Sequence, residues 1–444
     1  MVDPTQRQSP RRACTVAEIA VDDKYAVVGG PFGSKLVTKD YTETGIPVLR
    51  GSNLPFDRKI DLSDVVFVSE AKVKEDLFGN LAFPGDIVVT QRGTLGQVGL
   101  LPLEGPYDRY VISQSQMKLS IDRSKADPRF IYWYFRLPAV RKTFENLDSS
   151  SGVPHINLET FRSFELFLPN LGEQGLIATV LDSFDDLIEN NRRRIELLEE
   201  TARLLYREWF VHFRYPGHED VPPVDSELGP IPEGWEIREV GSVCKLVRGR
   251  SYRGEELVEE GGIAFLNLKC VERGGGFRSD GIKRYSGPFK PAQQTYPGDT
   301  VIAMTDMTQE RHVVGHAARV PSLDTEFGVI SLDLNRVIAN PEIDSDYLYG
   351  MFRYSEFSRE VKEFANGTNV LHLNPRSIEG RRFPCAPEHL QQSYADSIRA
   401  GVELIDQLEQ QNKLLAETRD LLLPRLVSGE LDVSDFDLDL EAVG

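Results

Sequence analysis

The sequence of 444 residues contains an internal repeat, in which stretches of the first half return in the second half. Three stretches of the first half return in the second half at one offset of 217 residues, and a fourth returns at an offset of 213. Chance does not explain agreement at separated places with one spacing, so the chain is predicted to be an internal duplication with two similar domains. The matching stretches are FIYWYFR and YLYGMFR from Phe130 and Tyr347, HIN and HLN from His155 and His372, LLEETARLL and LLAETRDLL from Leu197 and Leu414, and PGDIVV and PGDTVI from Pro84 and Pro297.

Each half ends in a stretch whose apolar residues recur in alternating steps of four and three. This spacing is typical of a coiled-coil helix. The second stretch has polar or small lapses, and Pro424 is expected to end or kink its helix near Leu423. The first seam is Ile177, Leu181, Phe184, Ile188, Asn191, Ile195, Leu198, Ala202, Leu205 and Trp209, and the second is Tyr394, Ile398, Gly401, Ile405, Leu408, Asn412, Leu415, Arg419, Leu422 and Leu426.

The two helices could pair with each other through these seams. If they run antiparallel in full overlap, Asn191 faces Asn412, and a single polar layer of this kind fixes the register of a coiled coil. We therefore expect one antiparallel two-helix coiled coil with these asparagines near its middle. The alternative is that each helix packs separately on its own domain.

Charge and pattern divide the chain. The net charge is −18, but segments 171–228 and 387–444 carry −7 and −9 of it, so the two large blocks are nearly neutral. Those blocks alternate short β-branched runs with turns, and DPRFIYWYFR and DSDYLYGMFR read as short helices with buried aromatic stripes. The fold class is therefore α+β, with an internal pseudo-two-fold repeat. The expected parts are domain 1 (1–170), long helix 1 (171–214), a linker (215–228), domain 2 (229–386), long helix 2 (387–428) and a disordered acidic tail (429–444).

Motifs for catalysis are hard to find. GGPFGSKL at 29–36 looks like a phosphate-binding loop, but its serine and lysine stand in the wrong order for one. The four cysteines are scattered, which argues against a structural metal site and for a reducing, cytoplasmic location, and no apolar run suggests a membrane span. We expect a chain that catalyses nothing alone and binds no cofactor or metal.

Read together and in order, several stretches resemble the specificity subunit of Type I restriction–modification enzymes over nearly the whole chain. They are GGPFGSKLVTKDY, GIPVLRGSNL, PGDIVVTQRGTLGQVGL and GVPHINLETFRSFELFLP in the first half, and GPIPEGWEIREVGSVC, PGDTVIAMTDMTQERHVVG, GTNVLHLNPRSIEG and LLAETRDLLLPRLVSGELDV in the second. The resemblance implies two target recognition domains separated by an antiparallel coiled-coil spacer, each reading one half of a split sequence in double-stranded DNA. It also implies two methyltransferase subunits that use S-adenosylmethionine and restriction/translocase subunits that use ATP and Mg²⁺.

Candidate DNA contacts follow from side-chain chemistry, since Arg, Lys, Asn and Gln read bases and Ser, Thr, Lys and Arg hold phosphates. Because the second set differs from the first, we expect the two domains to read different sequences. The runner-up function is an interaction scaffold or DNA mimic, which the acidity suits, and a self-sufficient methyltransferase is a third. The candidates are Lys35, Arg50, Asn53, Gln91, Arg92 and Thr94 in the first half, and Arg248, Arg250, Arg253, Thr305, Asp306, Thr308 and Arg311 in the second.

Overall fold

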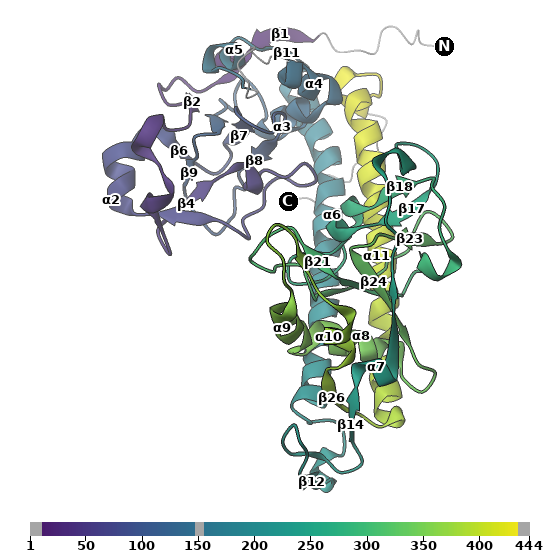
Figure 1. Cartoon of the computed structure of the whole chain (residues 1–444). Coiled ribbons are helices and arrows are strands. Elements are labelled where there is room, and N and C mark those ends of the chain that lie inside the picture. The colour runs from purple at the N-terminus through teal and green to yellow at the C-terminus, as the bar shows by residue number, and fades with distance from the viewer. Residues whose placement is uncertain (1–10, 147–154, 434–444) are drawn as a thin grey trace. The chain divides into compact units, whose positions relative to one another are not determined.

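The computed structural model describes residues 11–146 and 155–433 and divides into two compact units (Figure 1). Unit 1 runs to Glu189 and resumes at Asn412, and unit 2 is Asn190–Gln411. The part of the predicted acidic tail beyond residue 433 lies outside the described residues. Each unit therefore takes one segment from each of the two long helices.

Unit 1 contains a four-stranded sheet, a five-stranded sheet and a two-stranded ribbon. Within the five-stranded sheet β4 and β9 are parallel, and the other pairs are antiparallel. The orders are β2 (Val27–Gly29), β10 (Gln116–Leu119), β7 (Ile87–Thr90), β8 (Val98–Leu100); then β3 (Tyr41–Thr42), β5 (Val66–Val68), β4 (Ile46–Leu49), β9 (Tyr110–Ile112), β6 (Leu81–Ala82); and β1 (Arg12–Thr15) with β11 (Glu165–Leu168).

Unit 2 repeats this topology strand for strand, including the single parallel pair, here β17 with β23. The internal duplication is confirmed. The orders are β15 (Cys244–Arg248), β24 (Leu334–Ala339), β20 (Thr300–Ala303), β22 (Ala317–Arg319); then β16 (Leu257–Val258), β18 (Lys283–Tyr285), β17 (Ile263–Leu266), β23 (Gly328–Ile330), β19 (Gln294–Thr295); and β14 (Glu236–Glu239) with β26 (Arg382–Cys385). Two further small pairs are β12 (Pro223–Val224) with β13 (Ile231–Pro232) and β21 (Thr305–Asp306) with β25 (Leu371–His372).

The aromatic stretches form the expected helices. In α3 (Pro128–Arg136) and α8 (Ser345–Tyr354) the side chains of Asp127 and Asp344 accept bonds from the first backbone amides, and the aromatic stripes are buried. Since these rings fill the cores, they are not a base-stacking platform. The shorter helices are α1 (Val16–Ile19), α2 (Glu70–Lys72), α4 (Pro138–Asn146), α5 (Leu158–Arg162), α7 (Val240–Val243), α9 (Phe357–Val361) and α10 (Pro375–Glu379).

The repeat extends to single hydrogen bonds. In unit 1 the buried Gln174 accepts a bond from the Asp127 amide at 2.9 Å and donates to the Pro169 carbonyl at 2.8 Å. In unit 2 Gln391 makes the equivalent bonds, from the Asp344 amide at 3.0 Å and to the Ala386 carbonyl at 2.8 Å. Each glutamine thus fastens a long helix to its domain in the same way.

The two long helices are α6 (Leu171–Tyr206), extended by one wider turn (Arg207–Val211), and α11 (Glu388–Ser428). All the predicted seam positions are buried or half-buried. In unit 2 the helices run antiparallel, because contacts pair rising numbers on α6 with falling numbers on α11. Asn191 donates to Gln411 at 3.1 Å, and the Tyr394 hydroxyl donates to the Ala202 carbonyl at 3.2 Å. The α+β class, the repeat and the antiparallel helix pairing are confirmed.

The two asparagines that are predicted to set the coiled-coil register belong to different units, Asn191 to unit 2 and Asn412 to unit 1. Asn191 is buried and bonds Gln411, the neighbour of Asn412 in the sequence. That Asn191 faces Asn412 itself stays a prediction.

Of the two expectations for Pro424, an end of the helix near Leu423 does not occur, since α11 continues through Pro424 to Ser428, and a kink there stays a prediction. Proline costs a helix one backbone bond. The final turn nevertheless buries Leu423, Leu426 and Val427 in the core of unit 1, and this burial holds the helix together past the proline.

Candidate nucleic-acid interface

Loops from separate strands converge on the segment 113–116 at one end of the four-stranded sheet in unit 1. The Ser113 amide donates to the Leu49 carbonyl at 2.9 Å, at the end of β4. The Gln114 side chain donates to the carbonyls of Gly33 and Leu36 at 2.6 and 3.0 Å, in the loop after β2. Gln91, after β7, donates to the Gln114 carbonyl at 2.8 Å. This hydrogen-bonded cluster, called the loop hub below, brings together the three loops that carry the first set of candidates.

The candidates in these loops differ in exposure. Lys35, Arg92 and Thr94 are exposed. Arg50 is half-buried, and its guanidinium bonds the carboxylate of Asp64 at 3.3 Å. The exposed three form the polar edge of the hub, where their charges and hydroxyl can meet a polyanion.

The side chains of Asn53 and Gln91 form hydrogen bonds that hold the local structure of domain 1 together. Asn53 is 1% exposed, accepts from the Arg50 amide at 2.9 Å and donates to the Asp61 carbonyl at 2.9 Å. Gln91 is also buried, and its amide nitrogen is bonded to Gln114 within the hub. Since these amides hold turns together, we do not carry them into the proposed interface.

The octapeptide 29–36 needs its glycines for backbone packing. A Cβ on Gly30 would lie 1.9 Å from the Ser113 carbonyl oxygen, so only glycine lets the loop approach the hub. Gly33 has φ +63°, a left-handed conformation that glycine adopts without strain. The resemblance to a phosphate-binding loop is a consequence of tight packing.

Unit 2 has an equivalent hub around residues 331–334. The Ser331 amide donates to the Leu266 carbonyl at 2.8 Å, and Met304 donates to the Asp333 carbonyl at 2.7 Å. A Cβ on Gly249 would lie 2.0 Å from the Ser331 carbonyl oxygen, just as a Cβ on Gly30 would lie 1.9 Å from the Ser113 carbonyl oxygen in unit 1. The two domains thus build one scaffold from different sequences.

The arginines near this second hub also differ in exposure. Arg248 and Arg253 are exposed, and Arg253 pairs only loosely with Glu255 at 3.4 Å. Arg250 is held by Glu256 at 3.1 Å, and a bond to the Tyr285 hydroxyl is the first cause of its raised pKa. Arg250 therefore acts as a link within the domain.

The loop after β20 is organised by Asp306, which is 2% exposed. Burial raises its pKa, but bonds from the backbone amides of Val313 and Thr308 outweigh this effect, so the pKa lies below its ordinary value. The remaining candidates here are Thr305, buried and bonded to Asp333 at 3.0 Å, Thr308, whose hydroxyl donates to Asp306 at 2.9 Å, and Arg311, paired with Glu363 at 2.7 Å.

The repeated His-x-Asn stretches close loops against the domains. His155 forms a bridge with Arg92, and the Asn157 side chain accepts a bond from the Thr160 amide at 2.8 Å at the start of α5. His372 pairs with Thr305, and Asn374 caps α10 with a bond from the Arg376 amide at 3.0 Å. Both stretches therefore hold loops and helix ends within their own domains.

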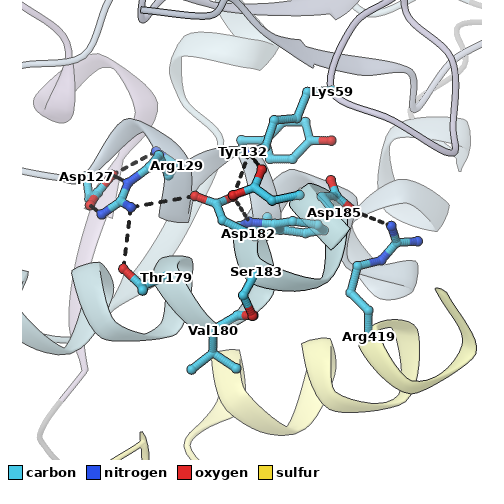
Figure 2. Close-up of polar contacts among 12 residues, drawn as sticks. Lys59, Asp127, Arg129, Tyr132, Thr179, Val180, Asp182, Ser183, Asp185 and Arg419 are labelled. Atoms are coloured by element: carbon cyan, nitrogen blue, oxygen red, sulfur yellow. Dashed lines mark hydrogen bonds and ion pairs between the residues drawn. The ribbon is translucent and has the colours of Figure 1, made fainter. Parts of the chain in front are cut away.

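A second polar cluster joins domain 1 to the long helices inside unit 1 (Figure 2). Asp182 accepts a bond from the Trp133 indole at 3.0 Å and pairs with Lys59 at 3.0 Å. One turn on, Asp185 pairs with Arg419 of α11, whose guanidinium lies over the Trp133 ring at 5.7 Å. Sequence reasoning treated Arg419 as a lapse in the seam, and the buried Asp185 gave no signal of its own.

Across the described ranges, the cysteines and the possible metal ligands stand at different positions in the fold. No group of three or more His, Cys, Asp or Glu side chains in these ranges could hold a metal ion. The four cysteines are free and buried, and burial raises the pKa of Cys270 to about 11. In the same part of the chain, each helix is too short or too polar to cross a membrane.

These features define a class: an internally duplicated α+β protein in which each unit joins loop-rich mixed sheets to a pair of antiparallel helices. Residues 38–200 match the family model described as Type I restriction modification DNA specificity domain. The chain is therefore similar to the specificity subunits of Type I restriction enzymes.

Relatives and a solved structure show the same similarity. The MjaIX specificity subunit of Methanocaldococcus jannaschii is 23% identical over 87% of this chain and 88% of its own length. The HindI specificity subunit of Haemophilus influenzae is 22% identical over 78% and 86%. The crystal structure of a Type I system S subunit from M. genitalium superposes with a TM-score of 0.54 at 16% identity, covering 96% of this chain and 97% of that one. The last comparison supports the fold.

Proposed function

We propose that this chain reads a split, asymmetric sequence in double-stranded DNA, one half-site with the hub of each unit. One observation carries the proposal: the same backbone junction occurs in both units, with the Ser113 or Ser331 amide bonded to the end of a strand and a glycine packed against it, while the exposed side chains around it differ. A shared scaffold with different side chains suits two readers of different sequences.

The exposed side chains supply the contacts. Arg and Lys can bond the acceptor edge of guanine or neutralise phosphates, and Thr can bond phosphate oxygens. The proposed set is Lys35, Arg92 and Thr94 in unit 1, and Arg248 and Arg253 in unit 2, with Arg50, Thr308 and Arg311 as candidates that must first leave their present partners.

The chain has no catalytic role in this proposal. Methyltransferase subunits supply S-adenosylmethionine chemistry on adenine, and restriction/translocase subunits supply ATP and Mg²⁺, all in the cytoplasm. The acidic long-helix segments would dock these proteins, because acidic surface placed against DNA would be repelled.

A gel-shift assay tests this function. The chain with its methyltransferase subunits should retard DNA in a sequence-dependent way, and Arg92→Ala should weaken binding and lower the salt slope by about 0.9 if Arg92 holds a phosphate. Arg123→Ala is the matched control, since this exposed arginine follows the opposite end of β10. If the two variants weakened binding equally, the hub would not be part of the DNA interface.

The alternative functions give different results in the same assay. A scaffold or DNA mimic would cause no sequence-dependent retardation with or without the partner. A self-sufficient methyltransferase would bind S-adenosylmethionine as an isolated chain.

A further inference from the structure

Unit 2 contains a pocket of about 240 Å³ between its helix pair and domain 2. Its apolar floor comes from both helices, and one wall is formed by Tyr349 and Tyr354, which are buried. Carboxylates line the helix side. The lining residues include Ala202, Gly401, Val402, Arg319, Asp406 and Glu409.

The internal repeat shows why the pocket is open. At the offset of 217 residues, Ala202 corresponds to Arg419, and Gly401 corresponds to Phe184. Val402 likewise corresponds to Asp185. Two large side chains of unit 1 are thus replaced by small ones in unit 2, and the space that they fill in unit 1 is left as the pocket.

In unit 1 this space holds an arginine side chain. Arg419 is 3% exposed, its guanidinium pairs with Asp185, and it lies over the Trp133 ring. It also bonds Asp420 at 2.8 Å. The fold therefore accommodates a guanidinium at this junction between helices and an aromatic wall, provided that carboxylates neutralise it.

Unit 2 also places carboxylates at this pocket, but at other positions of the repeat than Asp185 and Asp420, whose counterparts are Val402 and Arg203. Glu199, Asp406 and Glu409 line the pocket, and the residues at the positions of Glu199 and Glu409 in the other repeat are Ala416 and Arg192. Burial, with help from Asp406 and Glu199, raises the pKa of Glu409 to about 7. Glu199 and Glu409 are therefore particular to unit 2, whereas Asp406 corresponds to Glu189 of unit 1, and the crowding of these carboxylates carries a cost that a cation would relieve.

The other charged groups at the pocket have partners. Arg319 pairs with Asp346 at 2.5 Å and lies over the Tyr349 ring at 4.5 Å. Asp406 accepts a bond from the Ser322 hydroxyl at 2.9 Å, which leaves its other oxygen for a ligand. The positive charge of Arg319 is thus balanced within the domain.

We propose that this pocket is a binding site for an arginine side chain carried by another protein. The alkyl stem would lie on the apolar floor around Ala202 and Val402, and the guanidinium would face Asp406 and Glu409. The site takes from a partner what Arg419 supplies within unit 1.

Binding of N-acetyl-L-arginine amide to the purified full-length chain tests the proposal. Saturation-transfer NMR and the shift in thermal midpoint should both report binding, and the neutral isostere N-acetyl-L-citrulline amide should bind at least tenfold more weakly. Glu409→Gln should weaken binding of the arginine probe several-fold.

Variants of the pocket provide matched controls. Gly401→Phe restores the side chain found at Phe184 and should abolish probe binding, whereas Gly401→Ala should retain it. The alanine Cβ would lie 3.6 Å from a Leu198 methyl group, an ordinary contact. Ala202→Arg supplies the cation from within the chain, so it should block the probe and raise the midpoint, and the rise should shrink when Glu409→Gln is added.

The assembled complex with methyltransferase subunits distinguishes the sources of the arginine. If a subunit fills the pocket, the probe no longer binds in the complex. If the pocket stays open there, the arginine belongs to a protein outside the complex. Equal binding of the arginine and citrulline probes, or binding unaffected by Gly401→Phe, would overturn the proposal.

Discussion

Replacing Arg419 with leucine should destabilise unit 1 in a strongly pH-dependent way. The Arg419 and Asp185 side chains are 3% and 9% exposed, and the second oxygen of Asp185 has no hydrogen-bond partner. Without Arg419 this carboxylate would be buried with no cation, which costs about 3–5 kcal/mol in comparable cases.

The carboxyl can limit this cost by taking up a proton. Burial already raises the pKa of Asp185 against the opposing attraction of Arg419, so removal of the arginine raises it further. Neutralising a carboxyl with an ordinary pKa of about 3.9 costs about 1.4 kcal/mol per pH unit, or about 4 kcal/mol at pH 7 and about 1.5 at pH 5. Because the folded pKa is raised, the variant loses stability as pH rises and regains it as pH falls.

The assay is urea unfolding followed by Trp133 fluorescence. The chain has three tryptophans, and Trp209 and Trp235 belong to unit 2, so a Trp209→Phe, Trp235→Phe background leaves Trp133 as the reporter of unit 1. The matched control is Asp185→Val with Arg419→Leu, which removes both charges and uses the valine of the other repeat.

The double variant should recover most of the loss and show no extra pH slope, since an apolar pair leaves no charge unsatisfied. A pH-independent loss in Arg419→Leu, or a double variant as unstable as the single one, would refute the reasoning.

Three further outcomes are expected. Gln174→Ala and Gln391→Ala should each destabilise their own unit by about 1–3 kcal/mol, because each leaves buried backbone groups unpaired, as amide hydrogen exchange would show separately for the two units. Gly30→Ala should shift the first hub, since its Cβ would meet the Ser113 carbonyl at 1.9 Å, with a stability loss of about 3 kcal/mol and weaker DNA retardation. Burial, with nearby positive charges, lowers the pKa of His316 to about 4, so unit 2 should lose stability as pH falls from 6.5 towards 4, and a glutamine there should remove that loss in pH-dependent urea midpoints.

The sequence predicts those parts of the fold that have local signals or a second copy. The aromatic helices, the helix seams and the duplication are of this kind. The parallel pair β4–β9 joins strands that stand far apart in the sequence, and no local pattern announces it. Pro424 alone does not tell whether α11 ends there, because the local effect of the proline is outweighed by the tertiary burial of Leu426 and Val427.

The sequence predicts only part of the candidate site, because tertiary contacts decide which polar side chains of the loops stay exposed. Loops that carry Lys35 and Arg92 do meet at one hub, but residue type alone does not reveal which polar side chains the hub uses internally. Asn53 and Asp306 have side chains that can read DNA bases, yet short polar side chains in turns bond the nearby backbone first. Gln114 holds the hub together and has no distinguishing pattern in the sequence.

Mapping adenine methylation in the host genome, with and without this chain, tests the central claim most directly. The account predicts a motif that disappears with the chain and consists of two different short half-sites separated by a fixed run of unread positions. A continuous motif, or a methylation pattern unchanged by loss of the chain, would contradict it.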